Sequence, residues 1–162
     1  MKTRKLVLIA MFVAIAVAGS TFVSFPAGLA RAYPIQHAVN VISAVLLGPG
    51  PALLIAFLTG TVRVFTGTGS LLAFPGGMIG ALFAGIMYAK YGKVWLAALG
   101  EVAGTGIIAS FVAVPYAKFL MGTEFGAFFF FPPFLISSAS GALLGTFLVS
   151  RLMKVSENRL FE

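Results

Sequence analysis

The stretch LVLIAMFVAIAVAGSTFVSF, Leu6 to Phe25, runs for twenty residues without a charge. As an α-helix it would span about 30 Å, the thickness of the hydrocarbon core of a bilayer. Basic residues precede it, and Ala16 and Ala18 form an A-x-A pattern, so the stretch also resembles a cleavable signal peptide. Because further apolar segments follow it rather than a soluble domain, we expect a retained first transmembrane helix.

The composition of the whole chain supports a membrane protein. Its 162 residues are 60% hydrophobic and 9% charged, whereas soluble domains carry about 25% charged residues. The net charge of +7 comes from scattered basic residues, without the basic face interleaved with aromatic residues that is typical of nucleic-acid binding. The absence of cysteine and the single histidine argue against disulfides, iron–sulfur clusters, zinc and haem. No catalytic residues and no metal ligands are predicted, and nothing points to an enzyme.

Proline, glycine and charged residues divide the chain into six apolar segments. We therefore predict one all-α domain over residues 1–162, a compact bundle of six transmembrane helices. The segments are Leu6–Phe25, Pro34–Leu47, Pro51–Phe65, Leu71–Ala89, Val94–Leu120 and Phe128–Ser150.

The distribution of basic residues predicts the orientation. With a cytoplasmic N-terminus, eight of the eleven basic residues lie inside, as the positive-inside rule favours, and both termini are cytoplasmic. Arg31 and Lys118 then lie outside. The eight are Lys2, Arg4, Lys5, Lys90, Lys93, Arg151, Lys154 and Arg159.

The second and third segments are too short to cross the hydrocarbon core as straight helices. Such short helices are found where a bundle lines a cavity. Two other interpretations stay open: that the segment boundaries differ, or that the turn GPGP, residues 48–51, dips into the membrane.

The start of the second segment gathers the rarest residue types of the chain. Arg31 and Tyr33 precede it, and helical spacing places Gln36, His37 and Asn40 on one face. Facing lipid, these groups would be costly, so they must point into the bundle or a wet cavity. We favour a ligand site over interhelical hydrogen bonds alone.

Two charges lie inside predicted spans, where ionisable residues indicate functional sites. Arg63 is near the outer end of its helix, where it could join the site or reach the membrane surface. Glu101 is about 10 Å deep, where it could bind a ligand, pair with Arg63 or hold helices together.

Small residues recur at helical spacing in two places. Ala10, Ala14 and Ala18 form a smooth strip, which is either a packing face within the bundle or a docking face for another membrane protein. Close helix packing is predicted at Gly77, Ala81 and Gly85.

The aromatic run Phe128–Pro133 is interpreted as the outer rim of the last helix or the roof of a pocket.

The segments FPAGLARAYPIQHAVNVISAVLLGPG, FTGTGSLLAFPGGMIGALFAG and GEVAGTGI resemble the ThiW group of S components, the substrate-binding subunits of energy-coupling factor vitamin transporters. The resemblance covers essentially the whole chain. It implies a multi-pass protein of a prokaryotic plasma membrane that captures hydroxyethylthiazole, the thiazole precursor of thiamine, from outside.

The resemblance also implies partners: a transmembrane coupling protein, contacted by Ala10, Ala14 and Ala18, and two cytoplasmic ATPases. ATP would be hydrolysed by these partners, so this chain is expected to carry no cofactor. Two alternatives stay open: an S component for thiamine or its pyrimidine precursor, and a docking subunit that binds no small molecule.

The chain departs from the related thiamine-binding S components, which stack tryptophans on their ligand. The lone Trp95 is predicted at the cytoplasmic end of its helix as an interfacial anchor. An aromatic face would then come from Tyr33, Phe65 or the run Phe128–Phe131. The small-residue loop Phe25–Tyr33 is expected to act as a lid.

Overall fold

The computed structural model describes residues 2–27, 30–122 and 124–158, and these residues form a helical bundle with one short hairpin. The elements are α1 (Lys2–Phe22), β1 (Phe25–Ala27), β2 (Ala30–Ala32), α2 (Pro34–Leu47), α3 (Pro49–Phe65), α4 (Ala73–Tyr91), α5 (Val94–Val102), the π-helix η1 (Ala103–Ile108), α6 (Ala109–Met121) and α7 (Ala127–Asn158). Each of the six predicted apolar segments contains a helix, although α1 ends at Phe22, three residues before the predicted Phe25, and α4 begins at Ala73, two residues after the predicted Leu71.

The boundaries of α2 agree with the prediction, whereas α3 begins two residues earlier than predicted. Gly48 alone separates α2 from α3, with a φ angle of 87° that favours glycine. Pro49 then occupies the first turn of α3, where its missing N–H leaves no intrahelical bond unmade. The sequence GPGP is thus a one-residue turn and the start of a helix.

The predicted fifth segment is one helical run, Val94–Met121, that includes α5, η1 and α6. Pro115 lies within α6 without ending it. The π-helix begins two residues after Glu101 and includes Thr105. Such π-turns often occur at functional sites.

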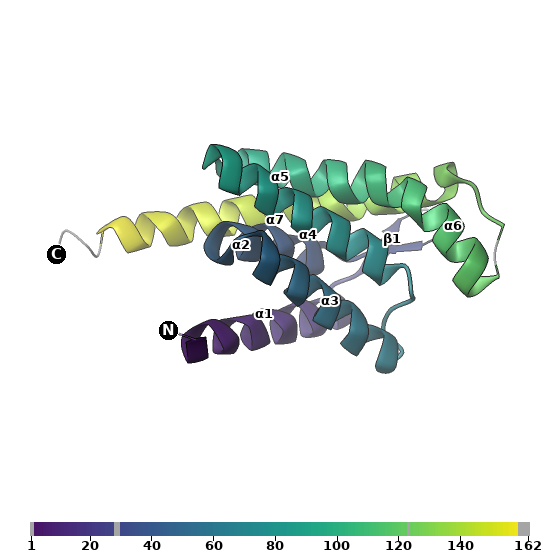
Figure 1. Cartoon of the computed structure of the whole chain (residues 1–162), viewed down its shortest axis with the longest axis horizontal. Coiled ribbons are helices and arrows are strands. Elements are labelled where there is room, and N and C mark those ends of the chain that lie inside the picture. The colour runs from purple at the N-terminus through teal and green to yellow at the C-terminus, as the bar shows by residue number, and fades with distance from the viewer. Residues whose placement is uncertain (1, 28–29, 123, 159–162) are drawn as a thin grey trace.

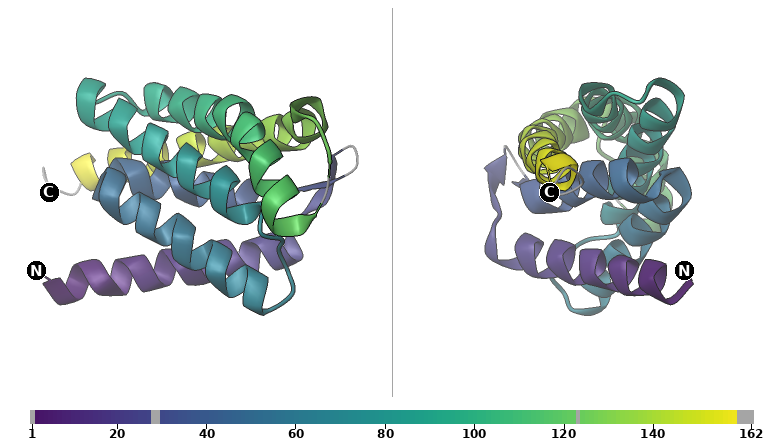
Figure 2. Two further views of the ribbon diagram at one scale, coloured as in Figure 1. Left: turned by 45° about the vertical axis from the view of Figure 1, so that its right-hand side comes forward. Right: turned by 90° about the vertical axis from the view of Figure 1, so that its left-hand side faces the viewer.

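Helix α2 forms the centre of the bundle. Eleven of its fourteen residues are buried, and it packs against α1, α3, α4, α5 and α7 (Figure 2). A helix buried on all sides must place its polar residues inside the protein. The apolar core around it includes Val41, Ile55, Ala81 and Val149.

The start of α1 and the end of α7 lie at one end of the bundle, and the hairpin lies at the other (Figure 1). The even number of membrane crossings and the cytoplasmic position of both termini stay predictions. Arg159, which the sequence analysis assigns to the cytoplasmic side, lies outside the described residues.

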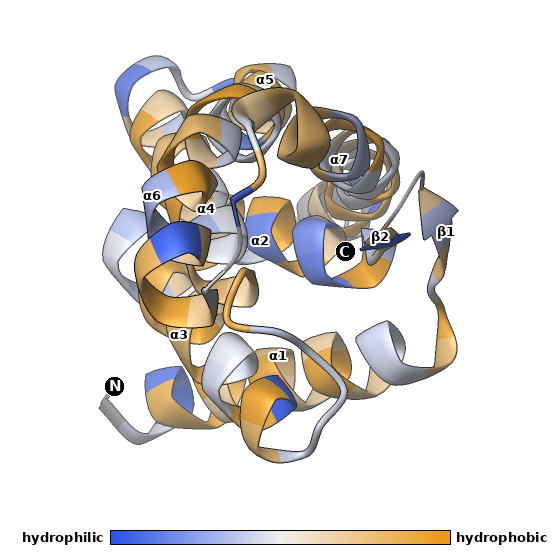
Figure 3. Ribbon diagram, turned by 90° about the vertical axis from the view of Figure 1, so that its right-hand side faces the viewer, coloured by the Kyte–Doolittle hydropathy of each residue, from blue (hydrophilic) through white to orange (hydrophobic). Residues whose placement is uncertain are grey.

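In the part of the chain that the structure describes, three helices are long and apolar enough to cross a membrane: Thr3–Phe22, Val94–Met121 and Ala127–Lys154. Helices α2 and α3 are apolar but shorter, with 14 and 17 residues. Viewed from the hairpin end, hydrophilic residues of α2 lie at the centre, among helices that are mostly apolar (Figure 3). The protein is therefore a helical membrane protein with a polar interior near one end.

Candidate functional site

A cavity of about 300 Å³ lies at the hairpin end of the bundle. Its walls come from β2, α2, the end of α3, the loop of residues 66–72, the start of α4, η1 and α7. The polar side chains in its lining are Arg31, Tyr33, Gln36, His37, Arg63, Thr68, Ser70, Thr105 and Ser137.

Five of the seven predicted substrate-binding residues line this cavity, namely Arg31, Tyr33, Gln36, His37 and Arg63. The other two, Asn40 and Glu101, are buried behind its wall, with 1% and 0% of their surface exposed. The structure thus brings the polar residues together. Asn40 and Glu101 do not line the cavity themselves, and Glu101 contacts the lining residue His37 from behind.

The polar residues form two groups, an upper half of the site around Arg63 and a lower half around Glu101. Arg63 organises the upper half. Its guanidinium donates hydrogen bonds to Gln36 Oε1 and, at 3.0 Å, to the carbonyl of Thr68. It also stacks over the ring of Tyr33, 3.9 Å from the ring centre. The side chain is 2% exposed, so it does not reach the surface, and its Nε has no partner among the described residues.

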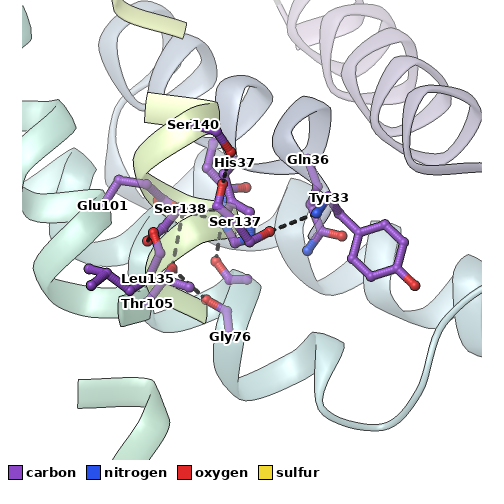
Figure 4. Close-up of polar contacts among 12 residues, drawn as sticks. Tyr33, Gln36, His37, Gly76, Glu101, Thr105, Leu135, Ser137, Ser138 and Ser140 are labelled. Atoms are coloured by element: carbon purple, nitrogen blue, oxygen red, sulfur yellow. Dashed lines mark hydrogen bonds and ion pairs between the residues drawn. The ribbon is translucent and has the colours of Figure 1, made fainter. Parts of the chain in front are cut away.

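Glu101 organises the lower half (Figure 4). Its Oε1 lies 2.6 Å from His37 Nδ1 and accepts a hydrogen bond of 3.1 Å from Asn40 Nδ2. Thr105 Oγ1 lies 3.1 Å from the same oxygen and 2.8 Å from the carbonyl of Gly76. The carboxylate pairs with His37 rather than with Arg63, which is bound by Gln36 and Thr68.

Helix α4 completes the lower half with its backbone. The carbonyl of Gly77 accepts a hydrogen bond from Asn40, and the carbonyl of Gly76 lies within hydrogen-bond distance of the Thr105 hydroxyl. A Cβ on Gly80 would lie 2.0 Å from Thr105 Oγ1 and 2.7 Å from each carboxylate oxygen of Glu101. Glycines in α4 therefore make the room in which these side chains meet.

Helix α7 contributes two residues that the sequence analysis missed. The hydroxyl of Ser137 accepts a hydrogen bond of 2.7 Å from the backbone N–H of Tyr33, and Phe134 lines the cavity. The signal for Ser137 was the polar pair Ser137–Ser138 inside an apolar helix.

The aromatic residues proposed to stack on a ligand have different positions. Tyr33 lines the cavity, but Phe65 is 86% exposed and no member of the run Phe128–Phe131 is in the lining. Trp95, at the start of α5, is exposed, as an interfacial anchor would be. Phe134 and Tyr33 thus supply the aromatic surface of the cavity.

The predicted lid contains the hairpin of β1 and β2. The strands pair antiparallel, with Phe25 opposite Ala32, and Ala30 and Arg31 line the cavity. Arg31 donates hydrogen bonds to the hydroxyl and carbonyl of Ser24, which hold its guanidinium near the end of α1. Residues 28 and 29 of this segment lie outside the described residues.

The alanine strip of α1 faces away from the bundle. Ala10, Ala14 and Ala18 are exposed, whereas Phe12 and Ala16 on the opposite side are buried. The strip is therefore not a packing face within this chain. The other interpretation, a docking face for another membrane protein, stays a prediction.

Within the described residues, no group of three or more histidine and acidic side chains could hold a metal ion. The arrangement of the site is that of a binding pocket: hydrogen-bonding groups and two aromatic rings around a cavity.

Residues 6–155 match the model of a family described as thiamine-precursor transporter protein (ThiW). The matched range includes the whole cavity lining and the alanine strip. No curated protein and no solved structure matches the chain significantly.

Proposed function

The chain belongs to the thiamine-precursor transporter protein (ThiW) family, and from this premise we propose that it is the substrate-capture subunit of an ATP-driven energy-coupling factor transporter. In this proposal, it binds hydroxyethylthiazole in the cavity at the hairpin end. The observation that carries the proposal is a cavity with a buried polar wall inside an otherwise apolar bundle.

The polar wall is better explained by a ligand than by helix association alone. An interhelical hydrogen bond in a membrane protein contributes only about 0.6 kcal/mol on average, whereas burying a charged side chain costs several kcal/mol. Arg63 and Glu101 are both fully buried, and each has one polar atom without a partner among the described residues. Such groups are retained where they recognise a ligand or hold a residue that does.

The size of the cavity favours a one-ring ligand. At about 300 Å³ it lies at the lower end of the range of roughly 300–1,000 Å³ for small-molecule sites. Hydroxyethylthiazole has one five-membered ring and a short alcohol, whereas thiamine has two linked rings.

The charge of the lining favours a neutral ligand over cationic thiamine. The charged side chains in the lining are those of Arg31 and Arg63, while the carboxylate of Glu101 lies behind the wall, paired with His37. A thiazolium cation would face two guanidinium groups without a carboxylate in contact.

The proposed orientation follows from the charges at the two ends of the bundle. The end that holds the start of α1 and the end of α7 has most of the basic residues, so we assign it to the cytoplasm. The cavity then opens toward the outside, as capture of an external ligand requires. The basic residues at the cytoplasmic end are Arg4, Lys5, Lys90, Lys93, Arg151 and Lys154.

The exposed alanine strip supports the proposed partners. A smooth strip at Ala10, Ala14 and Ala18 permits close helix contact with a transmembrane coupling protein. Two cytoplasmic ATPase subunits would hydrolyse ATP, and this chain itself would bind no cofactor.

The test is a calorimetric titration of the purified chain with hydroxyethylthiazole, the pyrimidine precursor and thiamine. Saturable binding of hydroxyethylthiazole alone is the expected result. Binding of either other compound instead would overturn the ligand assignment, and no binding by a folded sample would overturn capture in favour of a docking subunit.

A matched pair of variants ties the binding to the cavity. Ser137→Ala removes the hydroxyl that holds the backbone of Tyr33, so weaker binding is expected. Ser140→Ala, three residues further along α7, removes a hydroxyl that bonds only within its own helix. Ser140→Ala should bind like the wild type.

A further inference from the structure

The imidazole of His37 has two different surroundings. Its Nδ1 faces Glu101 at 2.6 Å inside the protein, while the residue itself lines the cavity. The second ring nitrogen, Nε2, makes no hydrogen bond to the described residues, and it is not among their fully buried polar atoms that lack a partner. The ring therefore connects a buried carboxylate to the space where a ligand would bind.

We infer that Glu101 is a positioning residue: it keeps the proton of His37 on Nδ1, so that Nε2 faces the cavity as a hydrogen-bond acceptor. Nε2 then selects ligands that carry a hydrogen-bond donor, such as an alcohol. The inference deepens the proposed function, because the hydroxyl of hydroxyethylthiazole would be the group that Nε2 recognises.

The surroundings of Glu101 Oε1 are those of a hydrogen-bond acceptor. Donors from two elements converge on Oε1, namely His37 Nδ1 and Asn40 Nδ2 from α2 and, from η1, the hydroxyl of Thr105. The single proton of that hydroxyl serves either Oε1 or the carbonyl of Gly76. A carboxylate oxygen has the lone pairs to accept more than one hydrogen bond of this kind.

The protonated form of Glu101 fits less well. A proton on Oε2 would find no acceptor, since Oε2 has no partner among the described residues, and an unpaired buried donor is costly. A proton on Oε1 would occupy a lone pair of that oxygen and so compete with the hydrogen bond that Asn40 Nδ2 donates to it. In neutral imidazole one nitrogen is the donor and the other the acceptor, so a proton fixed on Nδ1 leaves Nε2 as the acceptor.

Other charged and titratable groups around the cavity do not provide this effect. Arg63 from α3 is bound by Gln36 and Thr68 and stacked on Tyr33, and Arg31 of β2 is bound by Ser24. Both arginines are thus bonded to residues other than His37, whereas the side-chain hydrogen bond of His37 is to Glu101. Glu101 is thus the residue that decides which role Nε2 plays.

The direct test is the nitrogen spectrum of the imidazole. His37 is the only histidine of the chain, so ¹⁵N-histidine labelling of the full-length protein gives one imidazole to assign. At neutral pH we expect a protonated Nδ1 and an unprotonated Nε2. In Glu101→Gln the neutral amide no longer favours a proton on Nδ1, and a mixture of tautomers is expected. A protonated Nε2 in the wild type, or an unchanged spectrum in Glu101→Gln, would overturn the inference.

A binding test uses two probes that differ by one hydroxyl. The wild type should bind hydroxyethylthiazole about ten-fold more tightly than 5-ethyl-4-methylthiazole, which lacks the hydroxyl. His37→Phe keeps a ring but removes the acceptor, so this preference, measured as the ratio of the two affinities in the same variant, should disappear. An undiminished preference in His37→Phe would contradict the role of Nε2.

The two tests separate the inference from the proposed function. If neither thiazole binds, the proposed ligand is wrong, but the imidazole spectrum still decides whether Glu101 sets the tautomer. If hydroxyethylthiazole binds and Nε2 is protonated, the proposed ligand stands and the positioning role of Glu101 is refuted.

Discussion

Replacement of Gly80 by alanine is the most direct test of how the site is built. Gly80 lies on α4, opposite Glu101 of α5 and Thr105 of η1. A Cβ at this position would lie 2.0 Å from Thr105 Oγ1 and 2.7 Å from both carboxylate oxygens. To reach an ordinary contact of 3.4 Å, the hydroxyl must move by about 1.4 Å, and Glu101 must move as well.

The expected cost combines two effects. One extra methyl group in a well-packed interior costs about 1–3 kcal/mol. Moving Thr105 also weakens its hydrogen bond to the carbonyl of Gly76, which contributes about 1 kcal/mol. Thr105 lines the cavity and Glu101 holds His37, so part of this cost falls on ligand binding. We therefore expect the affinity for the ligand to drop about ten-fold or more.

Two assays of Gly80→Ala measure these effects. Calorimetric titration with hydroxyethylthiazole gives the affinity, and thermal unfolding in detergent gives the stability. Gly50→Ala is the matched control, because a Cβ there meets nothing within 4 Å and the position lies in the first turn of α3. If Gly80→Ala matched Gly50→Ala in both assays, the close approach of α4 to Glu101 and Thr105 would be refuted.

Three further predictions concern the other half of the site, the orientation and the docking strip. Arg63→Lys keeps the charge but not the planar fork that reaches Gln36 and Thr68, so calorimetry should show an affinity at least about ten-fold weaker; unchanged affinity would remove Arg63 from the site. The chain has no cysteine, so single cysteines report cleanly: Glu124→Cys should react with an impermeant maleimide on intact cells, and Lys93→Cys only after permeabilisation, whereas the reverse pattern would invert the proposed orientation. Ala14→Leu, on the exposed strip, should bind ligand normally but lose co-purification with the coupling protein, while the buried Ala16→Leu should lower the melting temperature.

The helices were predictable from the sequence because proline, glycine and charged residues separate the apolar runs. Proline at position 34 and glycine at position 48 delimit α2, whose predicted and observed boundaries agree. The hairpin between α1 and α2 was not predictable, because its strands are three residues long and carry no alternating pattern.

The residues of the site were predictable one by one, but their pairing was not. Helical spacing places His37 and Asn40 on one face of α2, and depth in the membrane marks Glu101. Which helices face each other depends on tertiary packing, and only the structure shows that Glu101 meets His37 while Arg63 meets Gln36. Ser137 was missed because a serine in an apolar helix can equally bond to its own backbone.

The glycines of α4 connect helix packing with recognition. The spacing of Gly77, Ala81 and Gly85 predicts close packing, and a Cβ on Gly85 would indeed lie 2.4 Å from the backbone of Pro49. The carbonyl of Gly77 also accepts a hydrogen bond from Asn40, because a carbonyl in a helix keeps a second lone pair for a side chain. The same small residues therefore bring the helices together and form a floor of polar backbone under the cavity.

This dual use makes the two halves of the site separable by experiment. A Cβ on Gly77 would lie 2.7 Å from Gln36 Nε2, so the methyl group of Gly77→Ala acts on Gln36 and, through it, on Arg63, while the backbone carbonyl that binds Asn40 is retained. Gly80→Ala acts on Glu101 and, through it, on His37. Both variants should bind hydroxyethylthiazole more weakly, but only Gly80→Ala should change the ¹⁵N spectrum of the imidazole. An equal change in both spectra would mean that Arg63 and Glu101 act as one coupled network rather than as two halves.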